Sequence, residues 1–130
     1  MRLYLASFLI WMYWLPIAAH STTMDVCKKA SEQTNRSLPA KKDNITVVRE
    51  TGCLPGNPKI RFVYILEVDI PLNIAKQINF ARDLKPGVKN TFCSDPSIRA
   101  LLNAFDVDHR YYTNDGSFAG SFLIQSSECN

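Results

Sequence analysis

The four cysteines carry the clearest chemical signal in this 130-residue sequence. Cys27, Cys53, Cys93 and Cys129 lie far apart, whereas zinc sites need close pairs such as C-x₂-C and dithiol redox sites need a C-x-x-C motif. An even number of cysteines in an exported chain indicates two disulfides, with three possible connectivities. The order of elements given below favours Cys27–Cys53 and Cys93–Cys129 and leaves the other pairings open. We expect no bound metal.

His109 is the other residue with catalytic potential, because it ends an Asp-Val-Asp-His run that begins at Asp106. Such a run could hold a metal or form an acid–base pair. In a strand, side chains alternate between faces, so Asp106 and Asp108 both diverge from His109. The sequence also has no G-x-S-x-G, H-E-x-x-H or phosphate-binding glycine motif. We therefore predict a non-enzymatic protein with no catalytic residue and no cofactor.

The first nineteen residues have the order of an export signal. Arg2 precedes the apolar run Leu3–Leu15, Pro16 breaks that run, and the small residues Ala18 and Ala19 follow. An uncleaved membrane anchor is the alternative, but the apolar stretch is shorter than the roughly 20 residues that a spanning helix needs. We expect a signal peptide at residues 1–19 and a single domain at 20–130, periplasmic or secreted, with no stable membrane anchor after cleavage.

Composition indicates a globular domain, with 46% hydrophobic and 21% charged residues. The formal net charge of +3 gives no reason to expect a nucleic-acid partner. Two sequons begin at Asn35 and Asn44 and would be possible glycosylation sites if the source is eukaryotic.

The hydrophobic periodicity predicts an α+β fold with two disulfides. Its sheet has four mostly antiparallel strands with about three helices on one face, in the order α-β-β-α-α-β-β. Pro86-Gly87 should end the second helix, and Gly52 to Pro58 should form a turn. The predicted helices cover residues 24–36, 71–85 and 96–105, with a possible short one at 88–93, and the predicted strands cover residues 44–50, 59–68, 106–113 and 118–125.

Alternation along the strands separates two faces of this sheet. Phe62, Leu66 and Val68 should face the helices, as should Phe118, Phe122 and Ile124 on the last strand. The opposite face mixes apolar and charged residues, with the tyrosine and arginine that are enriched at interfaces. This face is the candidate partner-binding surface, and its predicted residues are Arg61, Val63, Ile65, Arg110, Tyr112 and Leu123.

Several segments in this order carry a family resemblance. They include the strand around Phe62 and Tyr64, the run from Asn90 to Pro96, the hairpin that contains Gly116, and Cys129. The pattern resembles the small periplasmic pilotins of the AspS-like type from type II secretion systems, and related uncharacterised periplasmic proteins. The resemblance implies an α+β fold, a Cys93–Cys129 disulfide and a non-enzymatic role, in which a pilotin binds the C-terminal segment of a secretin and escorts it to the outer membrane. Pilotins of this kind have a lipidation cysteine directly after the signal, and this sequence has none.

The leading prediction is thus an exported accessory protein that binds a protein partner, and the resemblance implies a pilotin-like role in a bacterial secretion or envelope assembly. The partner would be a secretin or another envelope protein. The first alternative is a small secreted inhibitor or effector. The second is a hydrolase-type enzyme that uses His109.

Overall fold

The computed structural model describes residues 23–129, so the predicted signal peptide at residues 1–19 lies outside the described residues. None of the helices within 23–129 has the length and apolar composition that a membrane-spanning segment requires.

The sheet has five strands in sequence order, so the predicted α+β class is right and the predicted number of strands is one too low. The extra strand has only two residues, and it lies in a segment whose sequence predicts a basic loop. Three neighbouring pairs are antiparallel, and β3 and β4 are parallel. The strands are β1 (Ala40–Lys41), β2 (Thr46–Leu54), β3 (Arg61–Val68), β4 (Asp106–Thr113) and β5 (Phe118–Ile124).

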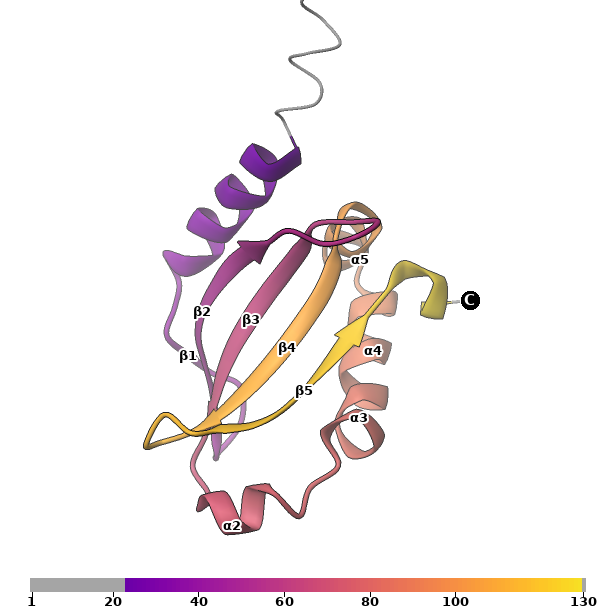
Figure 1. Ribbon diagram of the computed structural model, residues 1–130. Helices are drawn as coiled ribbons and strands as arrows, with labels where there is room; N and C mark the ends of the chain where they lie inside the picture. Colours follow the sequence, from indigo (N-terminus) through magenta and orange to yellow (C-terminus); the bar gives the residue numbers. More distant parts are fainter. Residues whose placement is uncertain (1–22, 130) are drawn as a thin grey trace, which may run out of the picture.

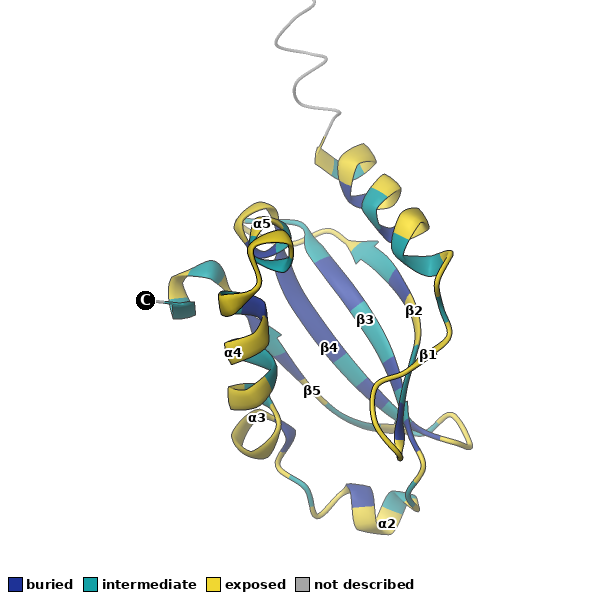
Figure 2. Ribbon diagram, turned by 180° about the vertical axis from the view of Figure 1, so that it is seen from behind, coloured by how far each residue is buried: buried dark blue, intermediate teal, exposed yellow. Residues whose placement is uncertain are grey.

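The helices lie on one face of this sheet and at its end (Figures 1 and 2). The first helix covers residues 23–35, close to the predicted 24–36. Four helices fill the connection that makes β3 and β4 parallel, as such a crossover requires. They are α2 (Leu72–Ala75), α3 (Phe80–Asp83), α4 (Lys85–Ser94) and α5 (Pro96–Ala104), and a 3₁₀ helix η1 (Ser126–Cys129) follows β5.

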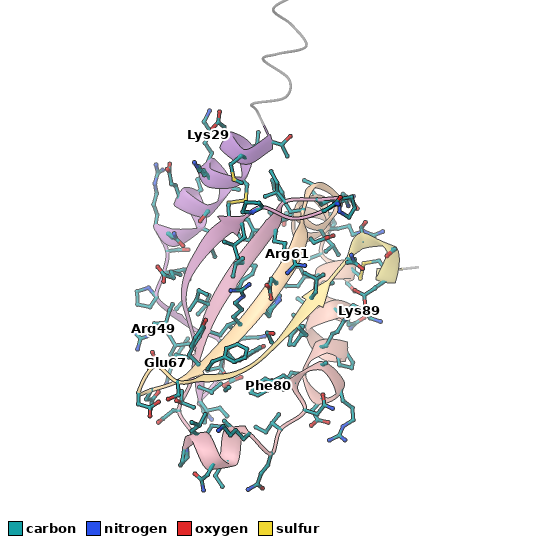
Figure 3. All side chains as sticks on the ribbon, in the orientation of Figure 1. Lys29, Arg49, Arg61, Glu67, Phe80 and Lys89 are labelled. Atoms are coloured by element: carbon teal, nitrogen blue, oxygen red, sulfur yellow. A yellow bond between two sulfur atoms is a disulfide. The ribbon has the colours of Figure 1, made fainter. Side chains whose placement is uncertain are left out.

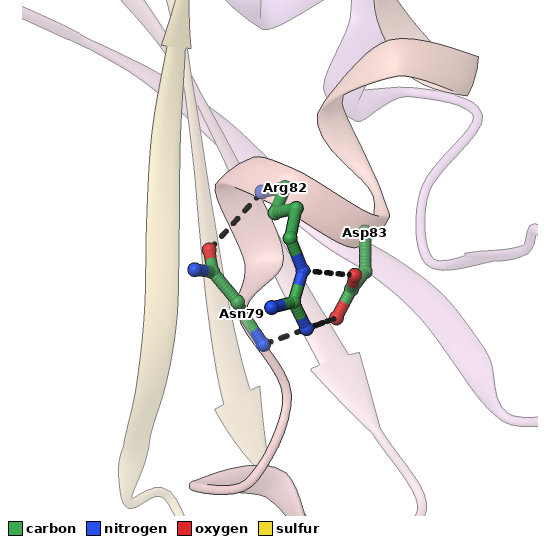
Figure 4. A network of polar contacts seen from close by, with 3 residues as sticks. All are labelled: Asn79, Arg82 and Asp83. Atoms are coloured by element: carbon green, nitrogen blue, oxygen red, sulfur yellow. Dashed lines mark hydrogen bonds and ion pairs between the residues drawn. The ribbon is translucent and has the colours of Figure 1, made fainter.

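The predicted continuous helix at 71–85 is wrong, because a new helix begins at Phe80. The Asn79 side chain accepts a hydrogen bond from the Arg82 backbone N–H at 3.1 Å, which caps α3. The Asp83 carboxylate pairs with the Arg82 guanidinium at 2.8 Å (Figure 4). Pro86 does not end a helix but lies in the first turn of α4, where its missing N–H leaves no bond unmade.

Strand β2 continues to Leu54, so the predicted turn begins at Pro55 and not at Gly52. Gly52 pairs with Val63, and Cys53 pairs with Phe62. Cys53 therefore faces the helices together with Phe62, and Gly52 points to the other face.

A register shift in β5 turns one predicted core residue outward. Tyr111 pairs with Gly120 and Tyr112 pairs with Phe118, so Ala119 is an extra residue in β5. The prediction that Phe118 shares a face with Phe122 and Ile124 is therefore wrong. Phe118 is 53% exposed, and its ring contacts the Tyr112 ring, with 5.6 Å between centroids.

The main core lies between the sheet and α3–α5. Leu66, Val107 and Ile124 from the strands are fully buried against Leu102 of α5. Phe80 of α3 packs so closely on Gly120 that a Cβ there would overlap its ring, which explains glycine at this position. A smaller cluster joins Cys27, Phe62 and Phe105, and it holds the first helix on the sheet.

His109 belongs to this core and not to a solvent-accessible site. It is 3% exposed and lies between the rings of Tyr64 and Phe122, with centroid distances of 5.1 and 5.0 Å. The three residues are in register on β3, β4 and β5. Burial, and to a lesser extent the positive charge of Lys42, lowers the pKa of His109 from 6.5 to about 3.

The disulfides join Cys27 to Cys53 and Cys93 to Cys129, as the order of elements favoured. The first connects the N-terminal helix to β2, and the second connects α4 to η1. Each closes a loop of moderate length, with sequence separations of 26 and 36 residues. Both pairs lie on the helix side of the sheet.

The Cys93–Cys129 disulfide should be a large part of the stability. Replacing both residues by serine should lower the free energy of unfolding by about 3–4 kcal/mol, because the unfolded chain regains the entropy of an open loop. Urea unfolding of the double variant and the wild type measures the difference. A loss below about 1 kcal/mol would contradict this account.

Acid should destabilise the protein through His109. Because its pKa is about 3 in the folded state and about 6.5 in the unfolded state, the unfolded chain takes up a proton first as the pH falls. Between pH 7 and pH 4.5 the free energy of unfolding should fall by about 2–3 kcal/mol from this residue alone. Above about pH 7.5, where the imidazole is neutral in both states, its contribution should be constant.

The His109→Phe variant separates this effect from that of the carboxylates whose pKa values are also lowered, such as Asp43. Phenylalanine fills a similar place in the ring stack but takes up no proton. Urea unfolding at both pH values should show a smaller acid loss in the variant. An identical loss in the two proteins would refute the assignment to His109.

Candidate functional site on the open face of the sheet

The structure places all six predicted partner-binding residues on the face that points away from the helices, called the open face from here on. They lie on three neighbouring strands, and none of the helices in residues 23–129 covers them (Figures 1 and 3). The pairing arranges this face in rows, so that Gly52, Val63, Asp108 and Leu123 form one row across β2–β5. Glu50, Ile65, Arg110 and Ser121 form the next row.

A buried carboxylate organises the arginines of the open face. Asp108 Oδ2 accepts a hydrogen bond from Arg110 Nε at 3.1 Å, and it also lies 3.1 Å from Arg110 Nη2 and 3.9 Å from Arg61 Nη1 as an ion pair. The Asp108 side chain is 7% exposed, whereas those of Arg110 and Arg61 are 34% and 42% exposed. Burying a carboxylate this far is costly unless its charge is paired. The hydrogen bond therefore holds the Arg110 guanidinium in place, and both guanidinium groups keep part of their N–H groups facing solvent.

A hollow of about 290 Å³ opens beside these arginines. Gly52 leaves it empty, because an ideal Cβ on this residue would meet no atom within 4 Å. Val63, only 4% exposed, and Ile65 form an apolar floor, and Leu54 is exposed on the wall. Arg110 and Glu50 complete the lining with opposite charges. This hollow is suited to one apolar side chain with a charged neighbour.

Sequence reasoning missed the β2 part of this surface. Gly52 and Leu54 read as a turn because Gly-Cys-Leu-Pro-Gly contains strong turn formers. Phe118 was missed because the bulge at Ala119 has no sequence signature. The available signal was Gly52 itself, since glycine inside a strand often marks close approach of a ligand or another backbone.

A second cleft, of about 330 Å³, lies on the helix side between the β1–β2 loop and α3–α4. Its floor includes Tyr111, whose pKa burial raises to about 12, so this residue remains a neutral phenol. Desolvation lowers the pKa of Lys42 on its rim. Two carboxylates there are already engaged, Asp43 with the N–H groups of Ile45 and Thr46 and Asp83 with Arg82. The two carboxylates of this cleft are thus already paired within the protein.

The two predicted sequons differ in their surroundings. Asn35 Oδ1 accepts hydrogen bonds from the Thr51 N–H at 2.7 Å and its hydroxyl at 2.9 Å, and Asn35 Nδ2 donates to the Thr51 carbonyl at 3.2 Å. A glycan would attach to the Asn35 Nδ2 atom that contacts the Thr51 carbonyl of β2. Asn44 is exposed in the β1–β2 loop.

The described residues offer no site of metal or thiol chemistry. Within 23–129 no three His, Cys, Asp or Glu side chains come together as metal ligands. All four cysteines are in disulfides. His109, the residue of the hydrolase alternative, is enclosed by aromatic rings, and its Nδ1 atom has no hydrogen-bond partner. Access of a substrate to this imidazole would require the core to open.

Comparison with known proteins identifies the fold. No protein-family model and no curated protein matches the sequence. A solved structure of a Pseudomonas aeruginosa protein described as secreted matches with a TM-score of 0.68 at 12% identity, covering 84% of this chain and 94% of that one.

Two pilotins of type II secretion systems share the same fold. EpsS from Vibrio vulnificus matches with a TM-score of 0.60 at 11% identity, covering 85% of this chain and 94% of EpsS. AspS from Vibrio cholerae matches with a TM-score of 0.57 at 12% identity, covering 84% and 94%. The predicted resemblance to AspS-like pilotins is therefore confirmed, as a likeness of fold.

Proposed function

We propose that this protein is an exported, non-enzymatic accessory protein of a bacterial secretion or envelope assembly, and that it binds a protein partner through the open face. The observation that carries the proposal is the fold shared with two type II secretion pilotins over 84–85% of the chain. The uncovered face with its positioned arginines supplies a surface for such a partner. The resemblance points to the C-terminal segment of a secretin as that partner.

Export is supported by the state of the cysteines. The four cysteines form two disulfides, which persist in oxidising compartments such as the periplasm and the outside of the cell. The signal pattern at residues 1–19 agrees with this assignment. A periplasmic location is the one that fits an envelope partner.

Lipid attachment separates this chain from the lipoprotein pilotins. Cys27, the cysteine nearest to the predicted cleavage site, is fully buried and bonded to Cys53. A lipid on its sulfur would remove that disulfide and open the cluster with Phe62 and Phe105. We therefore propose that the protein acts in the periplasm without a lipid anchor on Cys27.

A binding measurement tests the proposal. A fluorescent peptide with the C-terminal sequence of the secretin from the same genome should bind residues 20–130, and Arg110→Glu should weaken binding at least about tenfold, because it removes a positioned donor and adds repulsion. Arg36→Glu is the matched control, since Arg36 is exposed beyond the first helix and away from the open face. Absence of binding, or equal weakening by both variants, would contradict the proposal.

A secreted inhibitor or effector is the second candidate, and the match to the Pseudomonas aeruginosa protein described as secreted favours it. The two functions differ in where the mature chain accumulates. Cell fractionation should find it in the periplasm if it serves an envelope assembly. Recovery mainly from the culture medium would contradict the accessory role and support the effector.

A further inference from the structure

Gly52 is a strand residue that the fold does not require. No backbone strain calls for glycine, since the only positive-φ glycine among residues 23–129 is Gly116. No close packing calls for it either, since a Cβ would meet nothing within 4 Å. Glycine inside a strand nevertheless weakens it. What glycine does provide here is the hollow above Val63 and Ile65.

The charged side chains around this hollow are arranged asymmetrically, with arginine on one side and glutamate on the other. Arg110 and Glu50 flank Ile65 in one row, and Arg61 reaches toward Arg110 through their shared partner Asp108. Asp106 and Asp108 also belong to this face, but both are about 5% exposed. Farther along the face Glu67 is paired with Arg49 at 2.7 Å. A group bound in the hollow therefore meets the Arg110 guanidinium on the β4 side and the Glu50 carboxylate on the β2 side, while the Arg61 guanidinium lies outside the lining, near Asp108.

We propose that the partner segment places an apolar side chain in the hollow over Gly52 and an acidic side chain against Arg110 and Arg61. The apolar side chain covers the partly exposed Ile65 and the exposed Leu54, which contributes binding energy by removing apolar surface from water. The carboxylate meets the Arg110 guanidinium, which Asp108 already holds in place, so little entropy of that side chain is lost on binding. Glu50 repels the same carboxylate and so fixes the direction of the segment. This inference rests on the proposed protein-binding function and names the partner's chemistry.

Filling the hollow is the direct test. Gly52→Val should weaken binding of the secretin C-terminal peptide at least about tenfold. The variant should melt at the same or a higher temperature than the wild type, because valine suits a strand and has room there. Gly87→Val is the matched control, since Gly87 has equally empty surroundings but lines the helix-side cleft. Its binding should be unchanged.

Two further variants test the proposed contacts between the partner's carboxylate and the charged side chains. Arg110→Gln should weaken binding about five- to tenfold, whereas Glu50→Gln should leave it unchanged or tighten it. A peptide with an amidated C-terminus should bind as well as the free acid, because the recognised carboxylate is a side chain. Loss of binding on amidation would overturn this point and assign the site to the chain terminus.

A second probe separates this proposal from the proposed function. Random peptides displayed on phage and selected on residues 20–130 should be enriched in an apolar residue near Asp or Glu and should lose binding to Gly52→Val. If such peptides bind while the secretin peptide does not, the choice of partner is wrong and the site stands. Three results would overturn the site. Either probe binds Gly52→Val as well as the wild type, binding is lost with Gly87→Val, or the selected peptides show no enrichment in such residues.

Discussion

Packing of the helices against one face of the sheet is the constraint on which the rest of this structure depends. The parallel pairing of β3 and β4 requires a long crossover, and this crossover supplies α2–α5 to one side of the sheet. The N-terminal helix joins the same side through Cys27 and its contact with Phe62. Both disulfides and the ring stack of His109 also lie there. The other face is left to its own side chains, and this makes it available for binding.

That uncovered face is stabilised by a polar network and not by a second layer. Asp108 sits almost fully buried beneath Arg61 and Arg110, a costly position unless the charge is paired. The same pairing holds the Arg110 guanidinium in place before any partner arrives. Preorganised donors beside an apolar hollow combine the two features that interface hot spots share, namely a pocket for an anchor and a fixed arginine. The pairing with Asp108 thus contributes both to the stability of this face and to the proposed binding.

Alternation along β3 and β4 was enough to predict which side chains share the open face, because a side-chain period of two fixes the face once the strand is known. The disulfide pairing also followed from the order of elements. The predictions failed where long-range contacts override local signals. Gly52 joins β2 because it pairs with Val63, although its neighbours favour a turn. Phe118 faces outward because of a bulge opposite Tyr111 and Tyr112, and Asn79 starts a new helix inside a continuous apolar stripe.

The likeness to EpsS and AspS at 11–12% identity establishes the architecture, while the proposed binding surface is argued from this chain's own residues. The most direct test of the account is therefore to locate the partner on the protein. Residues 20–130 labelled with ¹⁵N would be titrated with the secretin peptide while amide shifts are recorded. The account predicts shifts concentrated at Gly52, Val63, Ile65 and Arg110. Shifts confined to the helix-side cleft, at Lys42, Gly87, Thr91 and Tyr111, would contradict it.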